Sequence, residues 1–188
     1  MASDYELFNI LNQSAPVIHF FSSRSGVLPV TKRAGVLFLD FPTDFIAPIE
    51  GLDTTITACI NVEPKAIYKG KTDLLVVVDN EVSVRHLQSN LAEIAKLKAR
   101  GIIVTAKGDS VDFVSRFFVL HSGIDEDPVT GSAHTSLIPY WSVVLGKNKL
   151  TAQQISKRGG QLFCELNQER CLIGGQAKLY LKGEIYLD

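Results

Sequence analysis

Apolar and polar residues follow one another along most of this chain in short runs that are typical of strands. Runs rich in β-branched and aromatic residues, separated by glycine and charged residues, predict strands at 16–22, 26–32 and 36–41. Later runs of the same kind predict strands at 66–68, 74–78, 102–106, 113–119, 162–166, 171–173, 177–181 and 185–187. The run at 74–78 is apolar at every position, which indicates a strand that is buried on both faces.

Two longer stretches have the residue spacing of helices. In the first, apolar residues recur three and four positions apart and predict an amphipathic surface helix that ends before Gly101; these residues are Val84, Leu87, Leu91, Ile94 and Leu97.

The second helix is predicted over 131–145, with Gly146 as its C-terminal stop. Its apolar residues lie on nearly every face and are Ala133, Leu137, Ile138, Tyr140, Trp141, Val143, Val144 and Leu145. Such a helix is usually buried, so we expect sheet to enclose it. Pro139 predicts a kink, because a proline inside a helix removes one backbone hydrogen bond.

The composition is that of a globular protein without a strong charge bias. The chain has 188 residues, 46% of them hydrophobic, with 19 lysines and arginines against 20 aspartates and glutamates. This balance argues against nucleic-acid and membrane-surface partners and favours small neutral or anionic ones. No apolar run is long enough to span a bilayer, and the N-terminus is acidic where a signal peptide is basic, so we expect a cytoplasmic protein.

The cysteines and most histidines suggest no chemistry. Cys59, Cys164 and Cys171 are odd in number and form no C-x-x-C pair, which is typical of reduced core thiols. Three histidines are too scattered to form a metal site, and these are His19, His86 and His121. We therefore predict no metal site.

The stretch EDPVTGSAH at 126–134 is the best candidate for a functional site, because it leads an acidic loop into the second helix. Pro128 biases Asp127 toward extended backbone and keeps its carboxylate outside the helix, and Thr130 can cap the helix. The unpaired N–H groups of Gly131 and the two residues after it then form a socket for a carboxylate or phosphate. An acid beside such a socket indicates proton transfer on an acidic metabolite.

Each of these residues also has a simpler explanation. Asp127 could stabilise the helix N-terminus by roughly 0.3–1 kcal/mol without any catalytic role. Ser132 could be an ordinary first-turn residue, and His134, two positions later, points elsewhere and cannot easily act as its base, which argues against a hydrolase triad. His134 is more often a packed helix residue than a catalyst, although its position leaves a role in proton handling open. Arg158 and Gly159 could form an ordinary turn before a strand.

Several motifs together resemble the phenazine-biosynthesis (PhzF-like) family. These are EDPVTGSAH, PYW at 139–141, LGK at 145–147 and SKRGG at 156–160, with weaker similarity in SRFF at 115–118, GI at 123–124 and GVLFLDFP at 35–42. The resemblance implies an α+β fold like that of diaminopimelate epimerase. It has two similar domains, each a curled, mostly antiparallel sheet around a central helix, and the active site lies where both helices begin.

The resemblance also implies domain bounds and residue roles. Residues 1–44 are expected to be an incomplete N-terminal domain, joined by a strand at 184–188, and residues 45–183 the C-terminal domain. The implied activity is that of a cofactor-independent isomerase or epimerase that moves a proton on a small carboxylated substrate. The catalytic residues are then Asp127 and Ser132, and the substrate-binding residues are Thr130, Gly131, Ser132, His134, Arg158 and Gly159. A two-thiol racemase is excluded, because the loop has Asp127 where such enzymes have a cysteine.

Two motifs of the family do not occur in this sequence. The family's general base is a glutamate in an Asn-x-Ser-Glu-Thr motif, and a Gly-His-Ala-Thr motif opens its first central helix. The chain resembles the family from just after this second motif, so we expect an N-terminal segment to be missing, while the family resemblance still favours an isomerase. The alternative function is then that of an inactive relative that binds a ligand or self-associates. Unpaired strand edges in an incomplete domain predict a homodimer.

Overall fold

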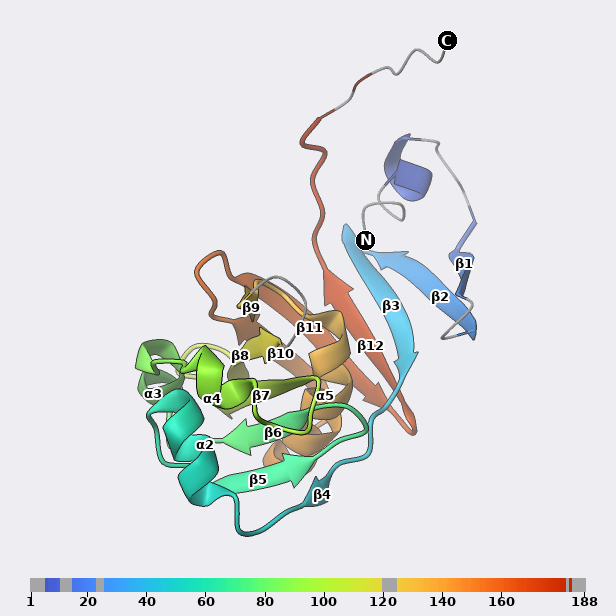
Figure 1. Ribbon diagram of the computed structural model, residues 1–188. Helices are drawn as coiled ribbons and strands as arrows, with labels where there is room; N and C mark the ends of the chain where they lie inside the picture. The colour runs from blue at the N-terminus through green and yellow to red at the C-terminus, as the bar shows by residue number, and fades with distance from the viewer. Residues whose placement is uncertain (1–5, 11–14, 23–25, 120–124, 182, 184–188) are drawn as a thin grey trace. The chain divides into compact units, whose positions relative to one another are not determined.

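The computed structural model describes residues 6–10, 15–22, 26–119, 125–181 and 183 of the chain. The chain forms two units, of which unit 1 is Met1–Asp40 with Gly174–Asp188 and unit 2 is Phe41–Ile173 (Figure 1). The domain bounds expected from the sequence remain a prediction. The strand expected at 184–188 lies outside the described residues.

Unit 1 is built on a three-stranded antiparallel meander. Its strands are β1 Val17–Ser22, β2 Gly26–Arg33 and β3 Val36–Pro42, preceded by a short π-helical turn, η1 Glu6–Ile10. Ala34 and Gly35 join β2 to β3 with φ angles of 47° and 80°, the positive values that a tight two-residue hairpin turn requires. The three strands predicted here are confirmed.

Unit 2 contains a mixed, mostly antiparallel sheet. In spatial order its strands are β12 Arg170–Gly175, β11 Gly160–Asn167, β10 Lys149–Gln154, β8 Phe113–Val119, β7 Gly101–Lys107, β6 Leu74–Val77, β5 Ala66–Lys69 and β4 Ala47–Pro48. The short strand β9 Glu126–Asp127 pairs with β8. The pairs β6·β7 and β8·β10 are parallel, because helices connect their strands.

Helices cover both faces of this sheet. The short helices α2 Asp53–Ile60, α3 Glu81–His86 and α4 Leu91–Ile94 pack on one face around Ile56, Val84 and Ile94. The long helix α5 Gly131–Leu145 packs on the other face, and residues from β6, β7, β8, β10, β11 and β12 surround it, so the sheet curls around α5 (Figure 1). Every residue of β6 is buried as predicted, because both faces of this strand are covered.

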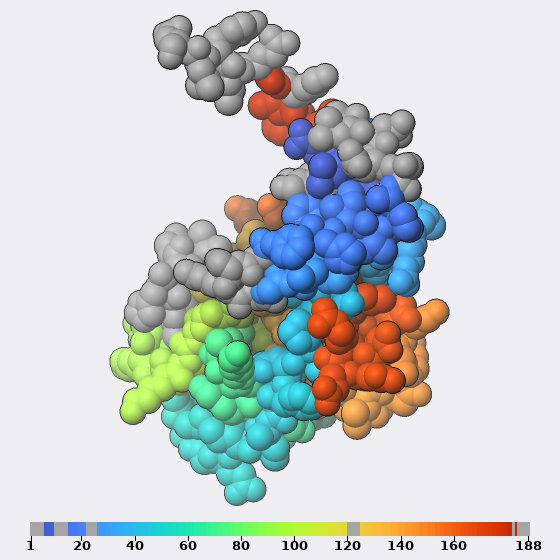
Figure 2. Space-filling model, turned by 90° about the vertical axis from the view of Figure 1, so that its right-hand side faces the viewer, coloured from blue at the N-terminus to red at the C-terminus, as the bar shows by residue number. Residues whose placement is uncertain are grey.

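The segment that enters unit 2 is tied to the turn before β12. Both the N–H and the hydroxyl of Thr43 donate to the carbonyl of Glu169, at 2.9 and 3.0 Å. These two stretches are visible as neighbouring cyan and orange-red atoms in Figure 2. The contact fixes the start of the loop that carries Asp44.

Most predicted strands and the helix at 131–145 are confirmed, and some elements differ. The predicted surface helix over 84–97 is wrong in its middle, because the chain leaves α3 at Leu87 and enters α4 after Asn90. Asn90 donates its N–H to the carbonyl of Cys59 at 2.7 Å, a contact that an unbroken helix could not make. Helix α2 and strand β10 were not predicted, and the strand predicted at 177–181 is not formed.

The burial of α5 is less complete than its composition predicts. Most of residues 133–138 and Trp141 are buried, but Val143 and Val144 have exposed fractions of 82% and 53%. Gly146 ends the helix in the left-handed conformation with φ of 64°, as predicted. The three cysteines are free and buried, which confirms that they are core thiols.

Candidate active site

The start of α5 is open to solvent. Gly131 and Ser132, its first two residues, are exposed. Apart from its chain neighbours and the nearby helix backbone, no atom of the described residues lies within 4 Å of the position that a Cβ at Gly131 would take. The first N–H groups of a helix have no partner within the helix, and the helix dipole adds positive charge there. The geometry therefore leaves room for an anion at these two residues.

Thr130 precedes the helix with extended backbone, at φ −111° and ψ 107°. The predicted side-chain cap is wrong, since the hydroxyl of Thr130 makes no capping hydrogen bond. This hydroxyl instead accepts a hydrogen bond from Nε2 of Gln154 at 3.2 Å. Thr130 is buried, so it supports the site from beneath.

Gln154 connects the acidic loop to the sheet. Its Oε1 accepts from the N–H of Thr130 at 2.8 Å, and its Nε2 donates to the carbonyl of Asp127 at 2.5 Å. The Gln154 side chain is fully buried at the end of β10. One glutamine thus satisfies polar groups at both ends of the Asp127–Thr130 loop and fixes its backbone.

The SKRGG turn packs against the same loop. The hydroxyl of Ser156 donates to the carbonyl of Pro128 at 2.8 Å and accepts from the N–H of Gly159 at 3.0 Å. Gly159 has φ of 68°, and a Cβ at Gly160 would lie 2.5 Å from a methyl carbon of Val129. The turn therefore needs glycine at both positions.

Arg158 extends from this turn into solvent. Its side chain is exposed and forms no ion pair with any residue that the structure describes. The structure places it on the turn that contacts the acidic loop.

The two acidic residues of β9 have different environments. Glu126 forms a two-pronged ion pair with Arg116 of β8, with Nε–Oε1 and Nη2–Oε2 distances of 2.7 and 2.8 Å. Its side chain is 18% exposed and that of Arg116 is 15% exposed, so the pair is largely shielded. Asp127 pairs with Phe117 across the strands, is half-buried, and interacts electrostatically with Arg100.

Arg100 connects the start of β7 to the start of α5. Its Nε donates to Oδ1 of Asp73 at 2.9 Å, and its Nη2 donates both to Oδ2 of Asp73 and to the hydroxyl of Ser132, the latter at 3.0 Å. The hydrogen bonds that Arg100 donates to Asp73, followed by the charges of Asp73, Asp44 and Asp127, raise the pKa of Arg100. A fixed positive charge therefore lies beside the exposed end of the helix.

Asp44 is a second carboxylate at the first turns of α5. Its Oδ2 accepts from the hydroxyl of Ser136 at 2.9 Å, and its N–H donates to the carbonyl of Thr135 at 3.1 Å. The N–H of Lys71 donates to both carboxylate oxygens, at 3.1 and 3.2 Å. A Cβ at Gly70 would lie 2.4 Å from Oδ2, so glycine leaves room for this carboxylate.

His134 does not join Gly131 and Ser132 at the open end of the helix. Its side chain is fully buried beside the ring of Phe113, with 5.9 Å between ring centroids. Its Nδ1 lies 2.7 Å from the carbonyl oxygen of Thr130 and so carries the hydrogen, while its Nε2 has no partner among the described residues. Burial lowers the pKa of His134 to about 4, which leaves the ring neutral at pH 7.

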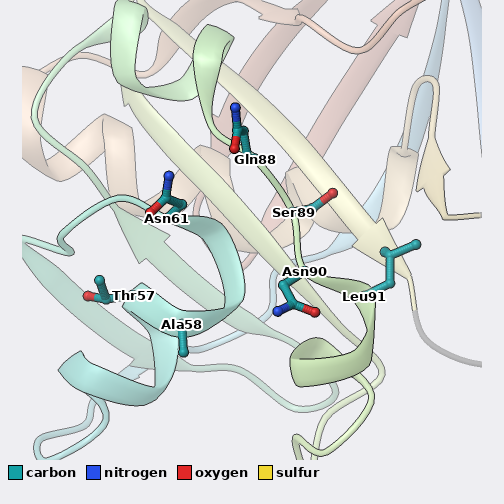
Figure 3. A pocket seen from close by; sticks show the side chains of 7 residues that line it. All are labelled: Thr57, Ala58, Asn61, Gln88, Ser89, Asn90 and Leu91. Atoms are coloured by element: carbon teal, nitrogen blue, oxygen red, sulfur yellow. The ribbon is translucent and has the colours of Figure 1, made fainter.

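A polar pocket of about 590 Å³ lies between α2 and the segment that joins α3 to α4 (Figure 3). Its lining residues are Thr57, Ala58, Asn61, Gln88, Ser89, Asn90 and Leu91. None of them has an ionisable side chain or an activated nucleophile, so this pocket offers no acid or base for proton transfer.

A second, apolar pocket of about 360 Å³ lies along the C-terminal half of α5. It is lined by Asp44, Phe45, Ile46, Tyr68, Pro139, Tyr140, Val143 and Val144. The described residues contain no group of three or more metal-ligating side chains and no helix long and apolar enough to cross a membrane.

The structure brings Asp127, Gly131 and Ser132 to the start of α5 as the sequence predicts, and adds residues that the sequence analysis missed. Gln154 follows Leu150 and Ala152 on the buried face of its strand, and a polar residue in that alternation is a signal that could have been read. Asp73 and Arg100 each precede a strand of a parallel pair, so their proximity could have been predicted once that pairing was known.

Comparisons with known proteins agree with this picture. The sequence profile described as PhzC-PhzF, phenazine biosynthesis-like protein, matches residues 1–183. A Pseudomonas aeruginosa protein named as an uncharacterized isomerase is 43% identical over 188 residues, which is 100% of this chain and 71% of that protein.

Two solved structures resemble the chain closely. A crystal structure of a PhzF-family phenazine biosynthesis protein from Enterococcus faecalis has a TM-score of 0.93 and 43% identity, covering 99% of this chain and 71% of that one. A putative PhzC/PhzF protein from Clostridium difficile has a TM-score of 0.86 and 36% identity, with the same coverage.

Proposed function

The chain belongs to the phenazine biosynthesis-like (PhzC-PhzF) family, and we propose that it carries a cofactor-independent isomerase site at the start of α5. In this proposal Asp127 transfers a proton on a small carboxylated substrate. The N–H groups of Gly131 and Ser132, together with the hydroxyl of Ser132, bind the carboxylate. Gly159 shapes the turn beside the loop, and Arg158 attracts the anion from solvent.

The exposed start of a long buried helix beside a held aspartate is the observation that carries this proposal. Gly131 and Ser132 are exposed, while the backbone of Asp127 is fixed by the buried Gln154. Anions bind at helix N-termini because unpaired N–H groups and the dipole both favour negative charge. A positioned acid or base typically accelerates proton transfer by about 10²–10⁴-fold.

Binding of a carboxylate is the most direct test, since it requires no knowledge of the natural substrate. We expect benzoate and glutarate, titrated into ¹⁵N-labelled protein, to shift the amide resonances of Gly131 and Ser132. Ser132→Ala removes only the hydroxyl, whereas Ser132→Pro also removes the N–H and should abolish binding. Asp127→Asn should strengthen binding slightly, because it removes a negative charge near the anion.

Asp125→Asn is the matched control for Asp127→Asn. Asp125 is an exposed acid in the same loop, two residues away, so this variant changes the net charge equally. Identical carboxylate affinities in Asp127→Asn, Asp125→Asn and Ser132→Pro would mean that the anion binds elsewhere.

A second candidate function is favoured by one observation in unit 2. Phe45, Val143 and Val144 have exposed fractions of 76%, 82% and 53% around the apolar pocket beside α5. Clustered apolar surface of this kind commonly marks an association site. We therefore propose a homodimer through this surface, with light scattering as its test. We also propose a cytoplasmic location, because the three cysteines are buried and form no disulfide.

A further inference from the structure

We propose that Arg100 is a positioning residue of the α5 site: it orients the Ser132 hydroxyl to donate a hydrogen bond and supplies the positive charge that selects an anionic ligand. This inference rests on the proposed function, because it concerns the same anion at the same helix end. It adds a residue from a different element, the loop before β7, to the residues of the acidic loop.

The position of the Arg100 guanidinium is set without help from Ser132. Asp73 accepts from Nε and Nη2, and the Asp73 side chain is only 4% exposed. The guanidinium carbon lies 5.4 Å from the ring centroid of Phe117, and the backbone N–H of Arg100 donates to Thr72 at 2.7 Å. A guanidinium that donates two hydrogen bonds to one carboxylate and packs over an aromatic ring is a rigid donor.

This rigid donor determines the direction of the Ser132 hydroxyl. The oxygen of Ser132 accepts from Nη2 at 3.0 Å, so its own hydrogen must point away from Arg100. Within the described part of the chain, this hydroxyl donates to no acceptor. The hydrogen is therefore available to a ligand at the open end of α5.

The unused hydrogen-bond donors around Arg100 define the kind of ligand. Asp73, Asp44 and Asp127 all interact electrostatically with this single guanidinium. Its Nη1 makes no hydrogen bond to any residue that the structure describes, and the side chain is 41% exposed. A monoanion or a dianion placed here can accept hydrogen bonds from Nη1, the Ser132 hydroxyl and the helix amides without displacing Asp73.

The test is a double-mutant cycle on carboxylate binding, with benzoate and glutarate as probes. Arg100→Lys keeps a cation opposite Asp73 but cannot bond Asp73 and Ser132 at once, and should weaken binding about tenfold or more. Ser132→Ala should weaken it similarly. The double variant should bind carboxylate no more weakly than whichever single variant has the lower affinity, because both changes remove the same oriented hydroxyl.

Arg85→Lys is the matched control. Arg85 is a similarly exposed arginine, paired with Glu81 on α3, and it takes no part in the α5 site. We expect its carboxylate affinity to equal that of the wild type. Equal losses in Arg85→Lys and Arg100→Lys, or effects of Arg100→Lys and Ser132→Ala that multiply in the double variant, would overturn the proposal.

A ligand-free measurement separates this proposal from the proposed function. Arg100→Lys should shift the amide resonance of Ser132 in ¹⁵N-labelled protein, whereas Arg85→Lys should not. If the wild type binds neither probe but this shift is present, the proposed function fails and the positioning role of Arg100 stands. If the probes bind and the Ser132 resonance is insensitive to Arg100→Lys, the positioning role fails and the proposed function stands.

Discussion

Gln154 contributes to the site through hydrogen bonds alone, and its removal gives the sharpest prediction at the scale of single residues. Gln154→Leu leaves the buried N–H of Thr130 and the half-buried carbonyl of Asp127 without a partner. Each unsatisfied group costs about 1–3 kcal/mol, so for the two groups we expect the free energy of unfolding in urea to fall by about 2–6 kcal/mol. Carboxylate binding should weaken as well, since the loop loses its anchor.

Gln153→Leu provides the control on the same strand. Gln153 is half-buried, and its side chain bonds to no residue within the described ranges. Its replacement should change the free energy of unfolding by less than about 1 kcal/mol. Comparable losses in Gln153→Leu and Gln154→Leu would show that the buried amide does not hold the loop.

His134 predicts a pH dependence of stability. Its pKa is about 4 in the folded protein because of burial, against about 6.5 in the unfolded chain. The unfolded state therefore binds more protons between these values, and stability falls as the pH is lowered from 6.5 toward 4. Each pKa unit corresponds to about 1.4 kcal/mol, so the full loss attributable to His134 is at most about 3.5 kcal/mol.

Urea unfolding of the wild type and of His134→Gln at pH 7.5, 6.5, 5.5 and 4.5 measures this dependence. The other titrating groups are common to both proteins, so the difference between the two curves isolates His134. We expect the two curves to converge as the pH falls. Curves that remain parallel across this range would mean that His134 is not held neutral by burial.

At the residue scale, the sequence predicted the site residues of the acidic loop and the helix start but not the residues that contact them from other strands. Asp127, Gly131 and Ser132 could be predicted because proline, glycine and a helix start leave local signals within a few residues. Arg100 contacts Ser132 across 32 residues, and Gln154 contacts Thr130 across 24. Such contacts depend on which strands become neighbours, and no local pattern encodes that.

At the scale of elements, strand β9 depends on one ion pair. Glu126 accepts two hydrogen bonds from Arg116. The guanidinium carbon of Arg116 lies 4.9 Å from the ring centroid of Phe118, and its Nη1 donates to the carbonyl of Leu87. Glu126, the residue before Asp127, thus attaches β9 to β8 through this ion pair. The attachment keeps Asp127, the proposed catalytic residue, next to β8.

Glu126→Gln tests this attachment. The change keeps the shape but removes the charge from a largely shielded pair, so we expect a loss of about 1–3 kcal/mol in the free energy of unfolding. Amide hydrogen exchange at Asp127 should also become faster. Lys65→Met, which breaks an exposed pair with Asp79, should change stability little. An Asp127 amide that exchanges equally slowly in Glu126→Gln would contradict the proposed attachment.

Element prediction succeeded where the local pattern and the tertiary contacts agree. Helix α5 begins and ends as predicted, because the glycine at each end and the apolar spacing indicate the same bounds. The helix predicted over 84–97 is interrupted because Asn90 caps α4 with its side chain and bonds to α2 with its backbone. Periodicity alone could not show this break, since apolar spacing continues through it.

At the scale of the whole molecule, the fold class followed from motif resemblance, and the arrangement of strands did not. The parallel pairs β6·β7 and β8·β10 decide which residues meet at the start of α5, and they arise from helical connections rather than from any strand's own sequence. A short, specific motif can therefore identify the family while leaving the neighbours of its own residues undetermined.

Self-association is the prediction that belongs to this largest scale. Phe45, Val143 and Val144 expose apolar surface around one pocket, and burying such surface against a second copy gains roughly 25 cal/mol per Å² before the costs of association. We expect light scattering at tens of micromolar protein to give a mass above that of the monomer. Val143→Glu should shift the population toward monomer, because it would bury a carboxylate close to Asp44.

Val82→Glu distinguishes a specific interface from nonspecific association through exposed apolar residues. Val82 is 59% exposed on α3 and takes no part in the lining of the pocket, so this variant adds the same charge at a comparable site on another surface. A specific interface predicts that Val82→Glu retains the wild-type mass while Val143→Glu loses it. A wild type that is monomeric at these concentrations would show that the apolar surface beside α5 does not pair with itself, and would leave the carboxylate site as the sole proposed function.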